Sequence, residues 1–253
     1  MSAPAPDPLS PDIAPIAALF ADRSRARLLS ALLDGRRLPA SRLAAEAGVS
    51  ASTVSGHLAR LTAAGVVEVE ASGRFRFYRL AGPEVARVIE SLSVLAGLPP
   101  VASLRGHTRA ARLRAARTCY DHLAGRLGTA VLAALVRDGA LVRTDGTDGL
   151  ERAPGERLSA VVAKAPWALG PRAEQGFRRW GVDLPVVCAA RREPIRSCLD
   201  WTEQRHHLGG GLGAALLDAV RGRGWIASGP RPREVVITES GEAALTELLG
   251  ELS

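Results

Sequence analysis

The sequence predicts a mainly α chain with small β-hairpins, an α+β fold in two parts, and three observations carry that prediction. Between Leu38 and Leu80, one helical apolar pattern stops at Gly48 and a second helical pattern follows it. The pattern then changes to strand-like alternation, so the order is that of a winged helix-turn-helix. The rest of the chain contains an internal repeat, which indicates a C-terminal α/β domain built as a pseudo-repeat. A degenerate winged helix is a further option for that domain.

The first part is expected to begin with three short helices. Asp12 to Phe20 forms the first, with Asp12 as its N-cap, and Ser24 to Leu33 forms the second. A third helical pattern starts near Ser41 and stops at Gly48. Glycine commonly ends a helix because it adopts the left-handed backbone conformation without strain.

The fourth helix, Val49 to Leu61, has the features of a DNA-recognition helix. Val54, Leu58 and Leu61 share its inner face, and small hydroxyl side chains stand at its start. The start of a recognition helix is the part that approaches base edges in the major groove. A β-hairpin that turns at Gly73 follows and would form the wing.

The helix expected after the hairpin is Pro83 to Ala96. Proline suits its first turn because the missing N–H has no partner within the helix there. We expect its apolar residues to share one face, and these are Val85, Val88, Ile89, Leu92 and Leu95.

These segments together resemble the ArsR-type family of bacterial repressors. Ala18–Leu29 is similar to the family's opening helix pair, and Val49–Leu61 to its recognition helix. Ala64–Val67 is similar to the entry of its wing, and Arg74–Leu80 to the returning wing strand. The resemblance implies a homodimer whose interface is formed by the first helix and the helix after the wing. It also implies a double-stranded DNA operator with half-sites about one duplex turn apart.

The candidate DNA contacts lie on the recognition helix and the wing. Ser50 also suits the N-cap of that helix, and His57 and Arg60 are nearly as well suited to solvent. The wing arginines would bind a phosphate or the minor groove. The candidate residues are Ser50, Ser52, Thr53, Ser55, His57, Arg60, Arg74 and Arg76.

The internal repeat relates two segments of the second half. His122–Leu135 and His207–Val220 are identical at eight of fourteen positions. Each copy opens with histidine, contains glycines that permit close helix packing, and leads into a turn and a strand-like segment. The end of the chain, from Val235 to Leu249, reads as a strand, a helix N-cap and a final helix.

A cysteine precedes the first histidine of each copy. Cys119 and His122 are three residues apart on what we expect to be one helix, and Cys198 precedes His207 by nine residues. Two thiols and two imidazoles suit zinc or another soft or borderline divalent metal. Three interpretations stay open: a metal centre, a redox pair of thiols, and side chains that serve packing alone.

The resemblance restricts where sensing could occur. Metal-sensing members of the family often place cysteines before the recognition helix, or histidine and acidic ligands on the last dimer helix. The matching stretches here, Pro39–Ala47 and Pro83–Ala96, contain neither Cys nor His. Any sensing would therefore fall to the C-terminal domain.

Composition bears on partner and compartment. The net charge of +7 suits a polyanion, although a single lysine among 33 basic residues also suits a GC-rich genome. No apolar run could span a bilayer and Met1–Pro15 lacks a basic signal region, so we expect a cytoplasmic protein without a membrane partner. Three cysteines argue against a disulfide scaffold, and Cys188 is expected in a buried strand.

We therefore expect a disordered leader at 1–11, a DNA-binding and dimerisation domain at 12–98, a basic linker and helix at 99–117, and a sensor domain at 118–253. The expected function is a sequence-specific transcriptional regulator, a repressor released from its operator by a metal or thiol-reactive signal. An organic effector is the alternative. An enzyme with a zinc-type Cys/His centre is the rival from another class, but no catalytic constellation is legible.

Overall fold

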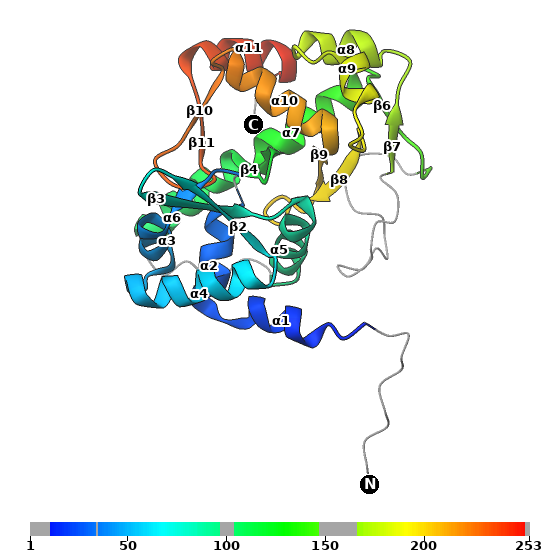
Figure 1. Ribbon diagram of the computed structural model, residues 1–253. Helices are drawn as coiled ribbons and strands as arrows, with labels where there is room; N and C mark the ends of the chain where they lie inside the picture. The colour runs from blue at the N-terminus through cyan, green and yellow to red at the C-terminus, as the bar shows by residue number, and fades with distance from the viewer. Residues whose placement is uncertain (1–10, 34, 97–103, 147–165, 251–253) are drawn as a thin grey trace. The chain divides into compact units, whose positions relative to one another are not determined.

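The computed structural model describes residues 11–33, 35–96, 104–146 and 166–250 (Figure 1). The chain divides into two compact units, Met1–Val85 and Ala86–Ser253. Residues 1–10 of the predicted leader and residues 147–165 lie outside the described residues.

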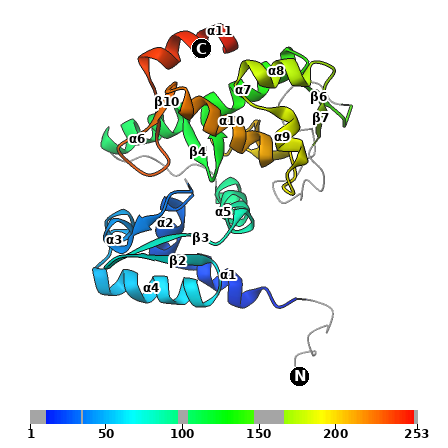
Figure 2. The same ribbon diagram turned by 45° about the horizontal axis from the view of Figure 1, so that its top comes forward.

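The first unit is the predicted winged helix-turn-helix. Its three strands form an antiparallel sheet in the order β1-β3-β2, and β2 and β3 pair in register from Val67–Leu80 to Ser72–Phe75. Helix α2 packs on α3, α3 on α4, and α4 on β2, as Figure 2 shows from a second side. The elements are α1 (Ala14–Ala21), α2 (Arg23–Ala31), β1 (Leu38–Pro39), α3 (Ala40–Ala47), α4 (Ala51–Ala63), β2 (Val67–Ser72) and β3 (Phe75–Leu80).

The turn between α3 and α4 follows from two residues. Gly48 adopts φ +70° at the end of α3, a conformation that costs glycine little. Ser50 is the N-cap of α4, and its hydroxyl accepts a hydrogen bond from the Thr53 N–H at 3.2 Å. The predicted cap of the first helix is displaced, because Ile13 occupies the N-cap while Asp12 accepts from the Ala14 N–H.

Helix α5 (Pro83–Ala96) differs from the single apolar face that the sequence predicts. Ala86, Ile89 and Val94 are buried together with the carboxylate of Glu90. A second apolar stripe remains exposed, and its members are Val88, Leu92 and Leu95. The helix therefore carries two apolar stripes with different environments.

The second unit repeats one order of elements: β-hairpin, helix, β-hairpin, helix. Helix α6 (Leu104–Ala115) precedes the first copy, and α9 (Leu184–Ala189) lies between the copies. The first copy comprises β4 (Arg117–Cys119), β5 (His122–Ala124), α7 (Gly125–Arg137), β6 (Leu141–Arg143), β7 (Trp167–Leu169) and α8 (Ala173–Arg179). The second comprises β8 (Arg196–Leu199), β9 (His206–Gly209), α10 (Gly210–Gly222), β10 (Ile226–Ser228), β11 (Val235–Ile237) and α11 (Glu239–Leu249).

The two copies are crossed rather than placed end to end. Helix α7 of the first copy packs on β9 of the second, and α10 packs on β5. Glycine keeps each helix close to the strand before it: a Cβ at Gly128 would lie 2.5 Å from the Leu123 carbonyl oxygen, and one at Gly213 would lie 2.4 Å from the Leu208 oxygen. The same Cβ atoms would face His207 and His122, respectively. The pseudo-repeat thus brings the two histidine-bearing strands together.

One apolar core joins both copies. It includes Leu127 and Leu132 of α7 and Leu212 and Leu216 of α10. The aromatic side chains at Trp167, Phe177 and Trp180 belong to this core rather than to a ligand pocket.

Two expectations for this unit are wrong. Cys188 is exposed on α9 instead of buried in a strand, because Asp183 caps a short helix there. The basic helix ends at Ala115, and Arg117 is fully buried in β4. The predicted final strand and helix are confirmed, with the Thr238 hydroxyl capping α11. None of the helices in the described part of the chain combines the length and apolar composition of a membrane span.

The crossing should be sensitive to a single methyl group. We expect Gly213→Ala to lower the free energy of unfolding by about 1–3 kcal/mol, because its Cβ would lie 3.0 Å from the His122 Cβ of the other copy and would also meet the Leu208 carbonyl. Gly222→Ala in the same helix meets nothing within 4 Å and should be neutral or stabilising by roughly 0.5–1 kcal/mol. Urea unfolding followed by circular dichroism measures both. Equal stability of the two variants would contradict the tight crossing.

Candidate metal centre and DNA interface

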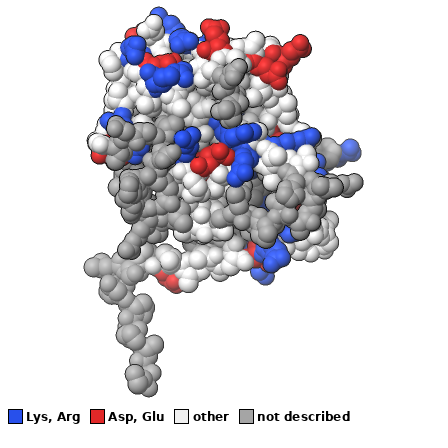
Figure 3. All heavy atoms as spheres, turned by 180° about the vertical axis from the view of Figure 1, so that it is seen from behind, with Lys and Arg blue, Asp and Glu red and all other residues white. Residues whose placement is uncertain are grey.

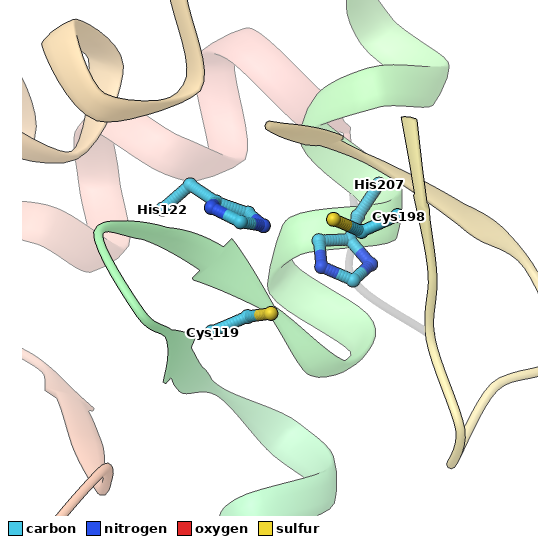
Figure 4. A group of neighbouring side chains, drawn as sticks. All are labelled: Cys119, His122, Cys198 and His207. Atoms are coloured by element: carbon cyan, nitrogen blue, oxygen red, sulfur yellow. The ribbon is translucent and has the colours of Figure 1, made fainter. Parts of the chain in front are cut away.

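Four side chains from the two copies converge in the second unit. They are Cys119, His122, Cys198 and His207, and their candidate ligand atoms all lie within 4.8 Å of one another. Figure 4 shows the two thiols and two imidazoles directed toward a common point. The structure therefore brings together all the residues that the sequence singles out as a metal or thiol site.

The local structure at these residues differs from the expected helix. Cys119 ends β4 and His122 begins β5, and the two are direct partners in the hairpin. Cys198 and His207 are direct partners in the β8–β9 hairpin in the same way. Cross-strand partners have Cβ atoms about 4.5–5.5 Å apart, so each hairpin presents one Cys–His pair. The helical spacing of three was coincidental.

The site is buried and contains unpaired polar atoms. The side chains of Cys119, His122 and His207 belong to buried residues, and Cys198 is partly exposed. Nε2 of His122 and both ring nitrogens of His207 are buried without a hydrogen-bond partner. Buried polar atoms are nearly always paired, so these nitrogens are free to bind a ligand. The imidazole rings lie 5.1 Å apart between centroids.

A carboxylate accompanies each histidine. Nδ1 of His122 lies 3.3 Å from Asp121 Oδ1, and Nδ1 of His207 lies 3.8 Å from Asp200 Oδ2. Carboxylates in this position orient imidazoles that bind a metal through the other nitrogen. The sequence indicates Asp121 and Asp200 as possible partners of the imidazoles, but the repeat that relates the two was not recognised. Arg117–Asp121 reads RTCYD and Arg196–Asp200 reads RSCLD, so the repeat begins five residues before the histidine segment of the first copy.

The carboxylate of Asp200 is the most heavily bonded group near the site. Arg117 Nη2 donates to it at 2.9 Å and the Gly125 N–H at 2.6 Å. The Thr202 N–H and hydroxyl donate at 2.9 and 2.7 Å, and the Glu203 N–H at 3.2 Å. Because Gly125 opens α7, Asp200 places a negative charge at the positive end of that helix.

These surroundings shift the pKa values of the site. Burial opposes ionisation of Asp200, but the Arg117 guanidinium and the hydrogen bonds from Thr202 and the Gly125 N–H hold its pKa well below its usual range. Burial lowers the pKa of His207, which leaves that imidazole neutral with a lone pair to offer. A hydrogen bond with Cys198, burial and the charge of Glu90 raise the pKa of the Cys119 thiol.

The candidate DNA residues lie in the first unit. Ser52, Thr53, Ser55 and Arg60 are exposed on α4, next to Gly56, where nothing lies within 4 Å of an added Cβ. Hydroxyls of Ser52 and Thr53 lie 2.9 Å from the capping Ser50 hydroxyl. The outer face of α4 is thus small and polar.

The basic candidates differ in how far they are exposed to solvent. His57 is mostly buried, with Nε2 3.6 Å from the carboxylate of Asp22. Arg74 and Arg76 are exposed at the wing, and the Arg74 guanidinium lies 5.2 Å from the Phe75 ring centroid. On the face shown in Figure 3, basic side chains stand among acidic ones.

Comparison with known proteins identifies the family to which this chain belongs. A helix-turn-helix domain model matches residues 20–70. An uncharacterized HTH-type transcriptional regulator, YdfF of Bacillus subtilis, is 37% identical over 241 residues, which cover 95% of this chain and 98% of YdfF. The chain belongs to the HTH-type transcriptional regulators. It is a transcriptional regulator, and its first domain is the winged helix-turn-helix that the sequence predicts.

Other relatives match this regulator over its first part. CmtR of Mycobacterium tuberculosis is 42% identical over 73 residues, which cover 29% of this chain and 61% of CmtR. Its solved structure, described as a cadmium sensor, covers 36% of the regulator and 98% of that chain at 37% identity, with a TM-score of 0.29. A homodimeric winged helix-turn-helix domain from Mycobacterium bovis covers 33% of the regulator and 77% of that chain at 30% identity, with a TM-score of 0.31.

The repeat provides a matched test of the Asp200 network. We expect Asp200→Asn to lower the free energy of unfolding of the metal-free chain by about 3–5 kcal/mol, because Arg117 is left as an uncompensated buried charge. Asp121→Asn, at the equivalent place of the other copy, should cost only about 0–1 kcal/mol, because its partner Arg192 is partly exposed. Denaturant unfolding in chelator measures both. A similar loss for the two variants would show that burial does not distinguish them.

Proposed function

We propose that this regulator is a homodimeric, metal-responsive repressor. In this proposal α4 and the wing bind a double-stranded operator, and metal binding in the C-terminal domain releases it. The convergence of two thiols and two imidazoles, with all four ligand atoms within 4.8 Å, carries the proposal. The regulator would act in the cytoplasm, where bacterial operators are. Residues 12–98 would serve binding and dimerisation, and 118–253 sensing.

The ligand set fits zinc or a similar thiophilic ion. Zinc binds thiolates at about 2.3 Å and imidazoles at about 2.0–2.1 Å, so ligand atoms this close need only small adjustments to share one ion. The unpaired nitrogens of His122 and His207 would gain a partner. Cys119 and Cys198 would bind as thiolates, and their two negative charges would balance a divalent cation.

Exposed apolar residues support a dimer. Helix α1 has no buried residue, and Ile16 is 49% exposed on it. Helix α5 exposes the stripe of Val88, Leu92 and Leu95. These are the two helices that the ArsR resemblance assigns to the interface. Burial of such surface is the main driving force for stable association.

A thiol switch is the second candidate, and the contact between Cys119 and Cys198 favours it. The two thiols are hydrogen-bonded neighbours and are not joined in a disulfide. Hydrogen peroxide could oxidise both thiols to one disulfide, with each molecule of hydrogen peroxide reduced to two molecules of water. The disulfide would remove both sulfur ligands.

Metal binding should depend on the paired cysteines. We expect the reduced chain to bind about one equivalent of Zn(II) or Cd(II), and Cys119→Ser/Cys198→Ser to lose at least about 100-fold in affinity. Cys188→Ser is the control, because that thiol is exposed on α9. Chelator competition and metal analysis measure both. Unchanged affinity in the double variant would exclude this site, and loss of operator affinity on peroxide treatment alone would favour the thiol switch.

The wing should contribute phosphate contacts. We expect Arg74→Ala and Arg76→Ala each to weaken DNA binding and to reduce the slope of log affinity against log salt by about 1. Arg178→Ala is the control, since that side chain pairs with Glu174 on the exposed face of α8. Fluorescence anisotropy with a duplex selected by the unmodified chain from a random library, at several KCl concentrations, provides the slopes. Slopes that match the control would remove the wing from the interface.

A further inference from the structure

Arg233 links the Cys119 strand to helix α5. Its Nη2 donates to Glu90 Oε1 at 2.6 Å, and its Nε donates to the Thr118 carbonyl at 3.1 Å. The side chains of Arg233 and Glu90 are only 10% and 9% exposed. One guanidinium therefore holds a carboxylate of α5 and the backbone beside Cys119 at the same time.

The backbone at Arg233 strengthens this link. The Thr118 N–H donates to the Arg233 carbonyl at 3.0 Å, and Arg117 and Glu234 form an antiparallel bridge. Arg233 also has φ +69°, a conformation that side chains other than glycine rarely adopt. An unfavourable backbone conformation persists where its surroundings require it, so the conformation of Arg233 is consistent with a specific role for its side-chain contacts.

A change at the Arg233 link would act on helix α5 through Glu90. It begins at Pro83 in the first unit and ends at Ala96 in the second. Glu90 is buried on it, and Glu90 Oε2 has no hydrogen-bond partner. The exposed stripe of Val88, Leu92 and Leu95 lies on the same helix. A displacement of Glu90 would therefore move a helix shared by both units.

We propose that the buried Glu90–Arg233 pair couples strand β4, and with it Cys119, to helix α5. The inference rests on the proposed function, since it names the residues through which the candidate metal centre acts. Thr118 is the neighbour of Cys119, so a movement of that ligand moves the carbonyl that Arg233 holds. The guanidinium must then follow or release Glu90. Arg233 and Glu90 are positioning residues and take no part in ligation.

Amide hydrogen exchange of the full chain tests the link. The test variant is Glu90→Gln/Arg233→Gln, which leaves no unpaired buried charge, and the control is Glu174→Gln/Arg178→Gln, a surface pair. In chelator, we expect exchange of residues 86–96 and 117–119 to be at least about fivefold faster in the test variant. The control should match the unmodified chain.

The same measurement with Zn(II) tests transmission. We expect Zn(II) to change exchange of α5 in the unmodified chain, and to leave α5 unaffected in the test variant while its Zn(II) affinity stays within about threefold. Equal responses of α5 in both would overturn the coupling. If the unmodified chain bound no Zn(II), the metal site would fail, and the comparison in chelator would still decide the link: equal exchange there overturns it.

Arg233→Lys separates geometry from charge. Lysine keeps the charge but lacks the planar fork that donates in two directions, so we expect it to behave like the double variant. It also leaves Glu90 with a cation and so reduces the risk of misfolding. Exchange of α5 equal to that of the unmodified chain would overturn the role of the fork.

Discussion

The buried ion pair of Arg117 and Asp200 is the constraint on which the second unit depends. Both side chains are fully buried, and charges in such a place are tolerated only when they are paired and hydrogen-bonded. Asp200 comes from the second copy of the repeat, while Arg117 and the N–H of Gly125 come from the first. The pair thus fixes β4, the start of α7 and the turn after β8 to one another. It satisfies the carboxylate so fully that Asp200 can support His207 while remaining outside the ligand group.

The crossing of the two copies depends on close packing of their helices and strands. Helices α7 and α10 begin with glycines and small residues, so each can lie against the histidine strand of the other copy. Neither hairpin alone presents more than one thiol and one imidazole. Burial of both hairpins in one core then brings two thiols and two imidazoles together, and Nε2 of His122 and both ring nitrogens of His207 lack hydrogen-bond partners there. The site is a product of packing between copies rather than of any single motif.

Much of the first unit could be predicted from its sequence, because local signals determine it. The turn at Gly48, the cap at Ser50 and the alternation around Gly73 each act within a few residues. In the second unit, the repeat identified the four candidate side chains, but the helix predicted for Cys119 and His122 was wrong. A spacing of three suits a helix, and the tight turn at Tyr120–Asp121, with Tyr120 at φ +56°, was not legible. No local pattern in the sequence indicates burial of Arg117, because its partner Asp200 lies 83 residues away. Comparing residues before each histidine would have revealed the shared pattern of Arg117–Asp121 and Arg196–Asp200.

The division of the four side chains between two fused copies has a consequence for concentration. If the copies were separate chains, completing the group would be a bimolecular event that dilution opposes. Because one polypeptide carries both, the second Cys–His pair is always present at a high effective concentration, whatever the amount of protein in the cell. The proposed dimerisation through α1 and α5 would keep its dependence on protein concentration. In that case ligand binding and operator occupancy would depend differently on expression level, and a scarce regulator could still be saturated with ligand.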